Sequence, residues 1–144
     1  MNKHAFTMIE LIFVIVILGI LAAVALPRFG GAKTSADLSR IKADATTIRA
    51  AIANERASQV IKGERSYIPK LNDNDADPLF TGVGNRQLLP LGIKSGTGSG
   101  QWQKSSNGKT FTAKVGDDTY TFTYYDNNGS FKCTSGNKCN YFNN

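Results

Sequence analysis

An apolar segment of 21 residues near the N-terminus limits how this chain can fold. Of the residues from Phe6 to Leu26, 18 are apolar, and the three exceptions are Thr7, Glu10 and Gly19. As an α-helix, 21 residues rise about 32 Å at roughly 1.5 Å per residue, which matches a hydrocarbon core about 30 Å thick. The segment is therefore predicted to cross a membrane as a helix.

A cleaved secretory signal peptide is the alternative interpretation of the same segment. Lys3 supplies a basic start, residues 11–21 an apolar core, and Ala-Val-Ala at 23–25 the small-x-small pattern of a cleavage site. Glu10 favours the membrane helix, because a signal that is removed has no use for an acid whose insertion costs up to about 2.5–3.5 kcal/mol at mid-membrane depth. Glu10 is then either functional or a complement to the helix dipole, which contributes roughly 0.3–1 kcal/mol.

The rest of the chain is polar and lacks the residues on which many enzymes depend. The single histidine, His4, precedes the apolar segment, so the soluble part has no histidine to act as base, proton shuttle or metal ligand. Neither a phosphate loop ending in Gly-Lys-Ser/Thr nor a Gly-x-Gly-x-x-Gly motif is present. The chain is predicted not to be an enzyme.

Weak helix formers follow the apolar segment. Pro27, Gly30 and Gly31 each destabilise a helix, Gly by about 1 kcal/mol relative to Ala and Pro by about 3 kcal/mol. They predict a kink over 27–31, or a stretch there that can unwind. Beyond it, apolar residues recur at spacings of 3 and 4, which predicts one amphipathic helix over 32–61 whose stripe packs on a sheet. The stripe consists of Leu38, Ile41, Ala45, Ile48 and Ile52.

Residues 62–100 show no sustained periodicity and contain three prolines and several glycines. They are predicted to form a long connection from the helix to a sheet, of a kind that usually carries function or surface identity. Asp73, Asp75 and Asp77 have the spacing of the start of an EF-hand calcium loop, but Pro78 follows where the motif requires Gly. A solvated acidic turn is the interpretation we favour.

From Gln101 onward, apolar and polar residues alternate, which predicts half-buried strands. Asn-Gly, Gly-Asp-Asp and a second Asn-Gly separate the alternating runs and indicate turns between them. Packed against the 32–61 helix, the strands would complete a small α+β globular domain over 32–144. The predicted antiparallel meander, 101–134, has strands near 101–105, 109–115, 119–125 and 130–134.

The two cysteines, Cys133 and Cys139, are separated by five residues. Two cysteines without histidine or further thiols make a poor zinc site, and their spacing does not fit a redox Cys-x-x-Cys pair. They predict instead a structural disulfide that closes the loop 133–139 in an oxidising compartment. Closing so short a loop contributes about 2–3 kcal/mol in the chain-entropy model.

The N-terminus combines three features in order. A short basic leader comes first, Phe-Thr-Met-Ile-Glu-Leu follows at 6–11, and an apolar run then ends in Ala-Leu-Pro at 25–27. This combination resembles the N-terminus of type IV pilins and type II secretion pseudopilins. The resemblance covers residues 1 to about 31, and the remainder agrees in architecture. It implies an α+β fold in which a long N-terminal helix, membrane-spanning in its first half and amphipathic in its second, packs on a four-stranded antiparallel sheet.

The resemblance implies how this N-terminus is used. A prepilin peptidase would remove the leader, 1–5, by cutting between Ala5 and Phe6, and the new amine of Phe6 would be methylated. Glu10 would then pair with the Phe6 amine of a neighbouring subunit as the helices, up to Pro27, pack into a filament core. Physical chemistry supports this pairing, because a buried carboxylate is tolerated when it is paired and the cut creates the partner ammonium. Family members most often have Gly in the place of Ala5.

The resemblance also implies partners and a location. The partners would be further copies and other pilin-like subunits, the prepilin peptidase, an inner-membrane platform protein and a motor ATPase. The chain would cross the inner membrane once, with its soluble domain in the periplasm or on a filament. Some pseudopilins hold calcium near the C-terminus, and the corresponding candidate ligands here are Asp117, Asp118 and Asp126. No other cofactor is implied.

Three functional hypotheses follow. The first is a structural subunit of a type II secretion or type IV pilus-like filament. The second is a competence-type subunit that supports DNA uptake, since without the leader 16 basic residues (17 less Lys3) stand against 11 acidic ones and favour non-specific binding to phosphate. The third is a plain exported or single-span protein in which Glu10 is incidental. The candidate nucleic-acid-binding residues are Lys104, Lys109, Lys114 and Lys132 with Tyr124 and Tyr125.

Overall fold

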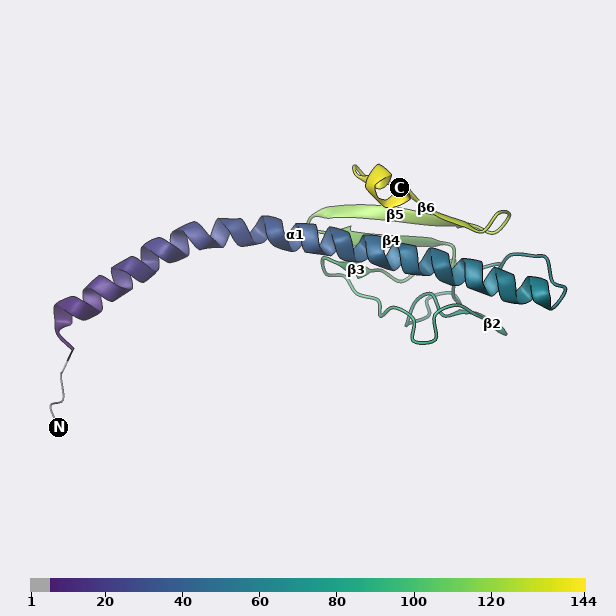
Figure 1. Cartoon of the computed structure of the whole chain (residues 1–144), viewed down its shortest axis with the longest axis horizontal. Helices are drawn as coiled ribbons and strands as arrows, with labels where there is room; N and C mark the ends of the chain where they lie inside the picture. Colours follow the sequence, from purple (N-terminus) through teal and green to yellow (C-terminus); the bar gives the residue numbers. More distant parts are fainter. Residues whose placement is uncertain (1–5) are drawn as a thin grey trace, which may run out of the picture. The chain divides into compact units, whose positions relative to one another are not determined.

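The computed structural model describes residues 6–144 (Figure 1). The leader, with its predicted cleavage residue Ala5, lies outside the described residues, as do the side chains of Leu26, Arg28 and Phe29. The chain divides into two units, Met1–Ser35 and Ala36–Asn144. The helix α1, Met8–Ile61, contributes to both.

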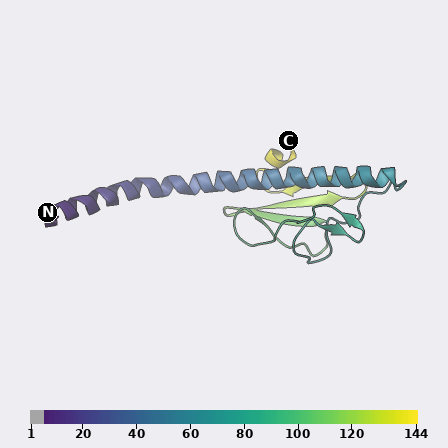
Figure 2. The same ribbon diagram turned by 60° about the horizontal axis from the view of Figure 1, so that its bottom comes forward.

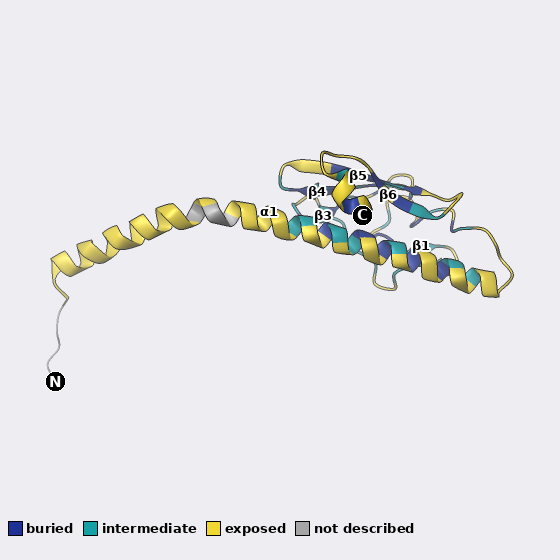
Figure 3. Ribbon diagram, turned by 45° about the horizontal axis from the view of Figure 1, so that its top comes forward, coloured by how far each residue is buried: buried dark blue, intermediate teal, exposed yellow. Residues whose placement is uncertain are grey.

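The described part of the first unit is the N-terminal portion of α1. Every large apolar side chain from Phe6 to Val24 is exposed, and this portion of the helix is yellow in Figure 3. The stretch Met8–Ala25 is long and apolar enough to cross a membrane. A continuous apolar surface of this extent marks a region that contacts lipid or protein.

The helix continues through 27–31, where a kink was predicted. Pro27 lies inside α1, and the hydroxyl of Thr34 donates to the Gly30 carbonyl at 3.2 Å. This segment is therefore helical in the single chain, and its kink or capacity to unwind stays a prediction. A helix satisfies its backbone groups internally, which is favoured where water is scarce, and one missing Pro N–H removes only one of these bonds.

The second half of α1 is amphipathic, as its spacing predicts. Ile41, Ala45, Ile48 and Ile52 are buried in the core of the second unit, and Leu38 packs against it. The helix ends in a Schellman motif at Gly63, whose φ is 86°. There the Glu64 N–H donates to the Gln59 carbonyl at 2.9 Å and the Gly63 N–H to the Val60 carbonyl at 3.0 Å.

Four antiparallel strands form the predicted sheet in the order β3-β4-β5-β6. Figure 2 shows the sheet along one side of the C-terminal half of α1. The strict alternation of buried and outward residues in β4 confirms the period-two pattern, and Phe111 pairs with Phe122 of β5. The strand bounds are Gln101–Trp102 for β3, Thr110–Val115 for β4, Asp118–Tyr125 for β5 and Ser130–Ser135 for β6.

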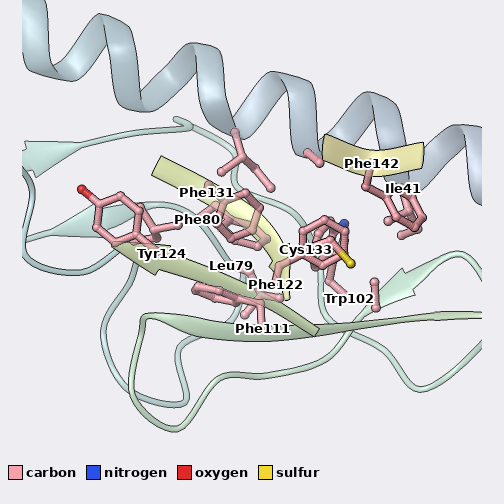
Figure 4. Packing of buried hydrophobic residues seen from close by; sticks show 14 of the residues in the cluster. Ile41, Leu79, Phe80, Trp102, Phe111, Phe122, Tyr124, Phe131, Cys133 and Phe142 are labelled. Atoms are coloured by element: carbon pink, nitrogen blue, oxygen red, sulfur yellow. The ribbon is translucent and has the colours of Figure 1, made fainter. Parts of the chain in front are cut away.

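The connection 62–100 contributes more to the core than its lack of periodicity suggests. It contains a short hairpin, β1 (Gly82–Val83) and β2 (Arg86–Gln87), and it buries Ile68, Leu71, Leu79 and Phe80. The Phe80 ring packs against Trp102 and Phe111 between helix and sheet (Figure 4). The observed fold is thus the predicted α+β arrangement, with a connection that forms part of the core.

A buried ion pair fixes this connection to α1. Arg86 donates from Nε to Glu55 Oε1 at 2.7 Å and from Nη2 to Glu55 Oε2 at 2.9 Å. The Glu55 side chain is only 3% exposed. The remaining donors of Arg86 bond the carbonyls of Ser66 and Tyr67 at 2.9 and 3.0 Å. Hydrogen bonding to Glu55 raises the pKa of the Arg86 guanidinium, which keeps the pair charged.

We expect Glu55→Ala to lower the free energy of unfolding by about 3–5 kcal/mol, because it leaves a guanidinium desolvated without its counter-charge. The matched control is Asp126→Ala, which removes the exposed Lys109–Asp126 pair and should cost below about 1 kcal/mol. Urea unfolding of the detergent-solubilised chain, followed by the fluorescence of the single, buried Trp102, measures both. Equal losses in the two variants would contradict the role of the buried pair.

Asp44 on α1 is a second half-buried acid, and it contacts β3. Its Oδ2 accepts from the Trp102 indole N–H at 3.0 Å. Burial raises the pKa of the Asp44 carboxyl above its usual 3.8, and the indole hydrogen bond and the charge of Arg40 offset only part of this effect. The folded state therefore holds this proton to a higher pH than the unfolded state does, so this group destabilises the fold as pH rises past about 4.

We predict that Asp44→Asn removes this pH-dependent loss while its amide oxygen keeps the bond from Trp102. The gain in unfolding free energy over the native sequence should be larger at pH 7 than at pH 3, since the carboxyl is charged only at the higher pH. Urea unfolding of both proteins at the two pH values measures this difference. A gain that is the same at both would show that the titration of Asp44 does not contribute.

Candidate functional site

The candidate site is the first turn of α1, where Glu10 lies. The Glu10 carboxylate accepts from the backbone N–H and from the hydroxyl of Thr7, both at 3.0 Å. In return, the Thr7 hydroxyl oxygen accepts from the Glu10 N–H at 3.3 Å. The Thr7 carbonyl accepts the first helical bond, from the Leu11 N–H, at 3.3 Å. Thr7 and Glu10 together form a reciprocal capping box.

The capping box gives Glu10 a partner within its own chain. The first N–H groups of a helix have no helical acceptor, and an acid in the first turn also complements the helix dipole. The exposed apolar side chains of Phe6 and Met8 flank this polar pair. A carboxylate at the head of an apolar helix is thereby hydrogen-bonded before any neighbour is present.

The role of Thr7 was not among the sequence predictions, although a signal for it was present. Thr7-Met8-Ile9-Glu10 has the Ser/Thr-x-x-Glu spacing of a capping box ahead of an apolar run. The two interpretations of Glu10, functional acid and complement to the helix terminus, are therefore compatible in one residue. Of the other N-terminal candidates, Phe6 is exposed, Pro27 is exposed inside α1, and Ala5 lies outside the described residues.

The three carboxylates proposed for calcium do not come together. Asp117 and Asp118 lie at the start of β5 and Asp126 follows its end, roughly 25 Å away at about 3.3 Å per residue. Asp118 accepts from the Asn137 side chain at 3.2 Å, and Asp126 pairs with Lys109 at 2.8 Å. The prediction that these three carboxylates share a calcium site is therefore wrong. Within residues 6–144, no group of three or more His, Cys, Asp or Glu side chains could hold a metal ion.

The candidate nucleic-acid face is also weaker than the sequence indicates. Tyr124 points into the core, where its hydroxyl donates to the Ile68 carbonyl at 2.9 Å and burial raises its pKa to about 12. It cannot stack on a base. Lys109 is paired with Asp126, while Lys114 and Lys132 lie on the outer face of the sheet. The candidates Lys104 and Tyr125 lie away from the core, and Tyr125 is exposed.

The predicted disulfide is present, between Cys133 within β6 and Cys139. Cys139 begins the short helix α2, Cys139–Asn143. The bond attaches the last residues of the chain to the sheet.

Helix and sheet together define a pilin-like protein: an apolar N-terminal helix with a capped acid in its first turn, continued by an amphipathic half that packs on a four-stranded antiparallel sheet. Comparisons with known proteins agree with this pilin-like assignment. A family model described as the prokaryotic N-terminal methylation motif matches residues 1–26. Over 124 residues the chain is 33% identical to the type IV narrow pilus major component PilA5 of Thermus thermophilus, covering 85% of this chain and 89% of that protein. No solved structure matches.

The chain therefore belongs to the type IV pilin family and is a pilin-type structural subunit. Its N-terminal apolar helix is the part that anchors such a subunit in a membrane or a filament.

We predict that Thr7→Val, which keeps the shape of the side chain but removes its hydroxyl, loosens the first turn of α1. Loss of an N-cap costs about 1 kcal/mol, so the amide hydrogens of Met8–Leu11 should exchange about fivefold faster. Amide exchange of the chain in detergent micelles measures this. Thr34→Val, which removes a hydroxyl in the middle of the same helix, serves as control, and equal changes in both variants would contradict the capping role.

Proposed function

We propose that this pilin is a subunit of a type IV pilus-like filament and that it assembles through its N-terminal helix. The observation that carries the proposal is Glu10, the one charged residue in a largely apolar helix segment whose large apolar side chains are exposed. An isolated subunit cannot bury this surface in its own core. Lipid covers it before assembly, and the same surface of other subunits covers it afterwards.

Assembly exchanges one partner of Glu10 for another. In the single chain, Thr7 supplies two donors to the carboxylate. We propose that the leader is cut between Ala5 and Phe6, that the new amine is methylated, and that this ammonium of one subunit approaches Glu10 of the next. A charged donor in a site without water binds a carboxylate more strongly than a neutral one does. The exchange therefore favours the filament.

The match to the N-terminal methylation motif supports the processing step of this proposal. A methylated amine stays protonated at neutral pH, so it keeps the positive charge that the pairing requires. The partners we propose are further copies of this chain, other pilins, a prepilin peptidase, and a platform protein with a motor ATPase. The proposed location is the inner membrane, with the second unit in the periplasm or on the filament surface.

A pilus is favoured over a type II secretion filament. The relative in Thermus thermophilus is named as the major component of a narrow pilus, and the likeness covers the soluble domain as well as the N-terminus. Resemblance confined to the first 26 residues would not distinguish the two machines.

Glu10→Ala tests the proposal in cells that express the chain together with its assembly proteins. The variant should fold and insert into the membrane, because the core of the second unit does not include residue 10. Filament yield should fall at least about tenfold, since an ammonium buried without its counter-charge costs several kcal/mol. Filaments sheared from cells, quantified against the membrane-bound pool, give the yield.

Glu64→Ala is the matched control, because Glu64 is an exposed acid outside the apolar helix. It should leave filament yield unchanged. Mass analysis of the N-terminus of the membrane-bound chain completes the test. Methylated Phe6 is expected as the first residue in all three proteins. Normal filament yield from Glu10→Ala, or a mature chain that begins near Leu26, would overturn the proposal.

A further inference from the structure

The two outer edges of the four-stranded sheet are covered by different means. An uncovered edge strand offers unpaired backbone groups to other chains. At β3, the backbone of 95–96 covers the edge: Ser95 bridges Trp102, and the Gly96 N–H donates to the Trp102 carbonyl at 2.8 Å. At β6, side chains from two helices cover the edge.

The carboxamide of Asn143 takes the place of a neighbouring strand at β6. The Cys133 N–H donates to Asn143 Oδ1 at 2.9 Å, and Asn143 Nδ2 donates to the Cys133 carbonyl at 3.0 Å. These are the two bonds that a directly paired residue of an antiparallel strand would make. Two residues along, Arg49 Nε of α1 donates to the Phe131 carbonyl at 2.8 Å.

Other residues of the short helix α2 contact the sheet and so hold Asn143 at this edge. Phe142, labelled in Figure 4, is fully buried. Its ring packs against Tyr120 and Phe122, with centroid distances of 5.0 and 5.3 Å. The disulfide to Cys133 fixes the other end of the helix. Besides that bond and Asn143 itself, Tyr141 holds the helix, because Lys42 Nζ of α1 lies 4.3 Å from the centroid of its ring. A helix of only five residues is not stable on its own and depends on these contacts.

We propose that the β6 edge from Cys133 onward is a latent strand-addition surface for a second copy of this chain, and that the C-terminal segment 136–144 keeps it closed as long as the disulfide is intact, while Arg49 of α1 covers the Phe131 carbonyl. The segment would thus protect subunits from pairing sheet to sheet. Reduction by a dithiol would release segment 136–144 from β6. The dithiol gives two electrons and two protons to the S–S bond, which becomes two cysteine thiols, and the dithiol itself becomes a disulfide.

A second copy fits this edge better than an unrelated strand. Antiparallel pairing of β6 with β6 is self-complementary, and it would continue the buried row of Phe131 and Cys133 on one face and the outward row of Lys132 and Thr134 on the other. Members of a filament-forming family also meet other copies of themselves at high local concentration. The inference concerns the sheet, so it holds whether or not Glu10 acts as proposed above.

The test uses the full-length chain in detergent, as the native sequence and as Asn143→Ala, each with and without a dithiol. Hydrogen exchange followed by mass spectrometry reports on Ser130–Ser135. We expect the Cys133 amide hydrogen, which Asn143 Oδ1 accepts, to exchange at least about tenfold faster in Asn143→Ala, and faster again after reduction. Asn140→Ala is the matched control, since Asn140 is an exposed asparagine of the same helix.

Amine cross-linking of mixed isotope-labelled and unlabelled copies reports on the occupant. A cross-link between Lys132 residues of two copies should form in reduced Asn143→Ala and be at least about tenfold weaker in the oxidised native chain, where strand addition is blocked. Unchanged exchange over Ser130–Ser135 in reduced Asn143→Ala would overturn the proposal, and so would an equal cross-link in the oxidised native chain. Faster exchange of Thr110–Val115 as well would also overturn it, because the edge would then open only with the whole sheet.

Discussion

The carboxylate of Glu10 needs a hydrogen-bond donor wherever the apolar helix is placed, because an ionised group without one is strongly destabilised outside water. Thr7 provides two donors in the single chain. The proposed filament replaces them with a neighbour's ammonium. In this proposal the acid acts at two stages: it caps the first turn of the helix in the single chain, and in the filament it would specify how far one helix advances along another. An apolar surface alone would give cohesion without such a register.

The second unit is stable for reasons that do not involve the apolar segment. Its core joins the inner stripe of α1 to the aromatic face of the sheet, and the Glu55–Arg86 pair ties the connection 62–100 to the same helix. Such a division suits a subunit whose N-terminal surface passes from lipid to protein. In the proposed assembly, the second unit would stay folded while the surroundings of the helix change.

Regular elements could be predicted from the sequence because each leaves a local periodic pattern. The stripe from Leu38 to Ile52, the alternation in β4 and β5 and the closely spaced cysteines are examples. Contacts between distant segments leave no such pattern. Ile68 and Phe80 are core residues in an aperiodic loop, and Asn143 bonds a strand ten residues away. The capping role of Thr7 was predictable, since its signal lies within four residues.

Side-chain density in a map of assembled filaments tests the central claim most directly, because it locates Glu10 after assembly. The account predicts that the Phe6 amine of one subunit lies within about 4 Å of the Glu10 carboxylate of a neighbour, the distance of an ion pair. The bonds from Thr7 to Glu10 seen in the single chain should then be weakened or replaced. Filaments in which Glu10 remains bonded only to its own Thr7, with every neighbouring amine far away, would contradict the account.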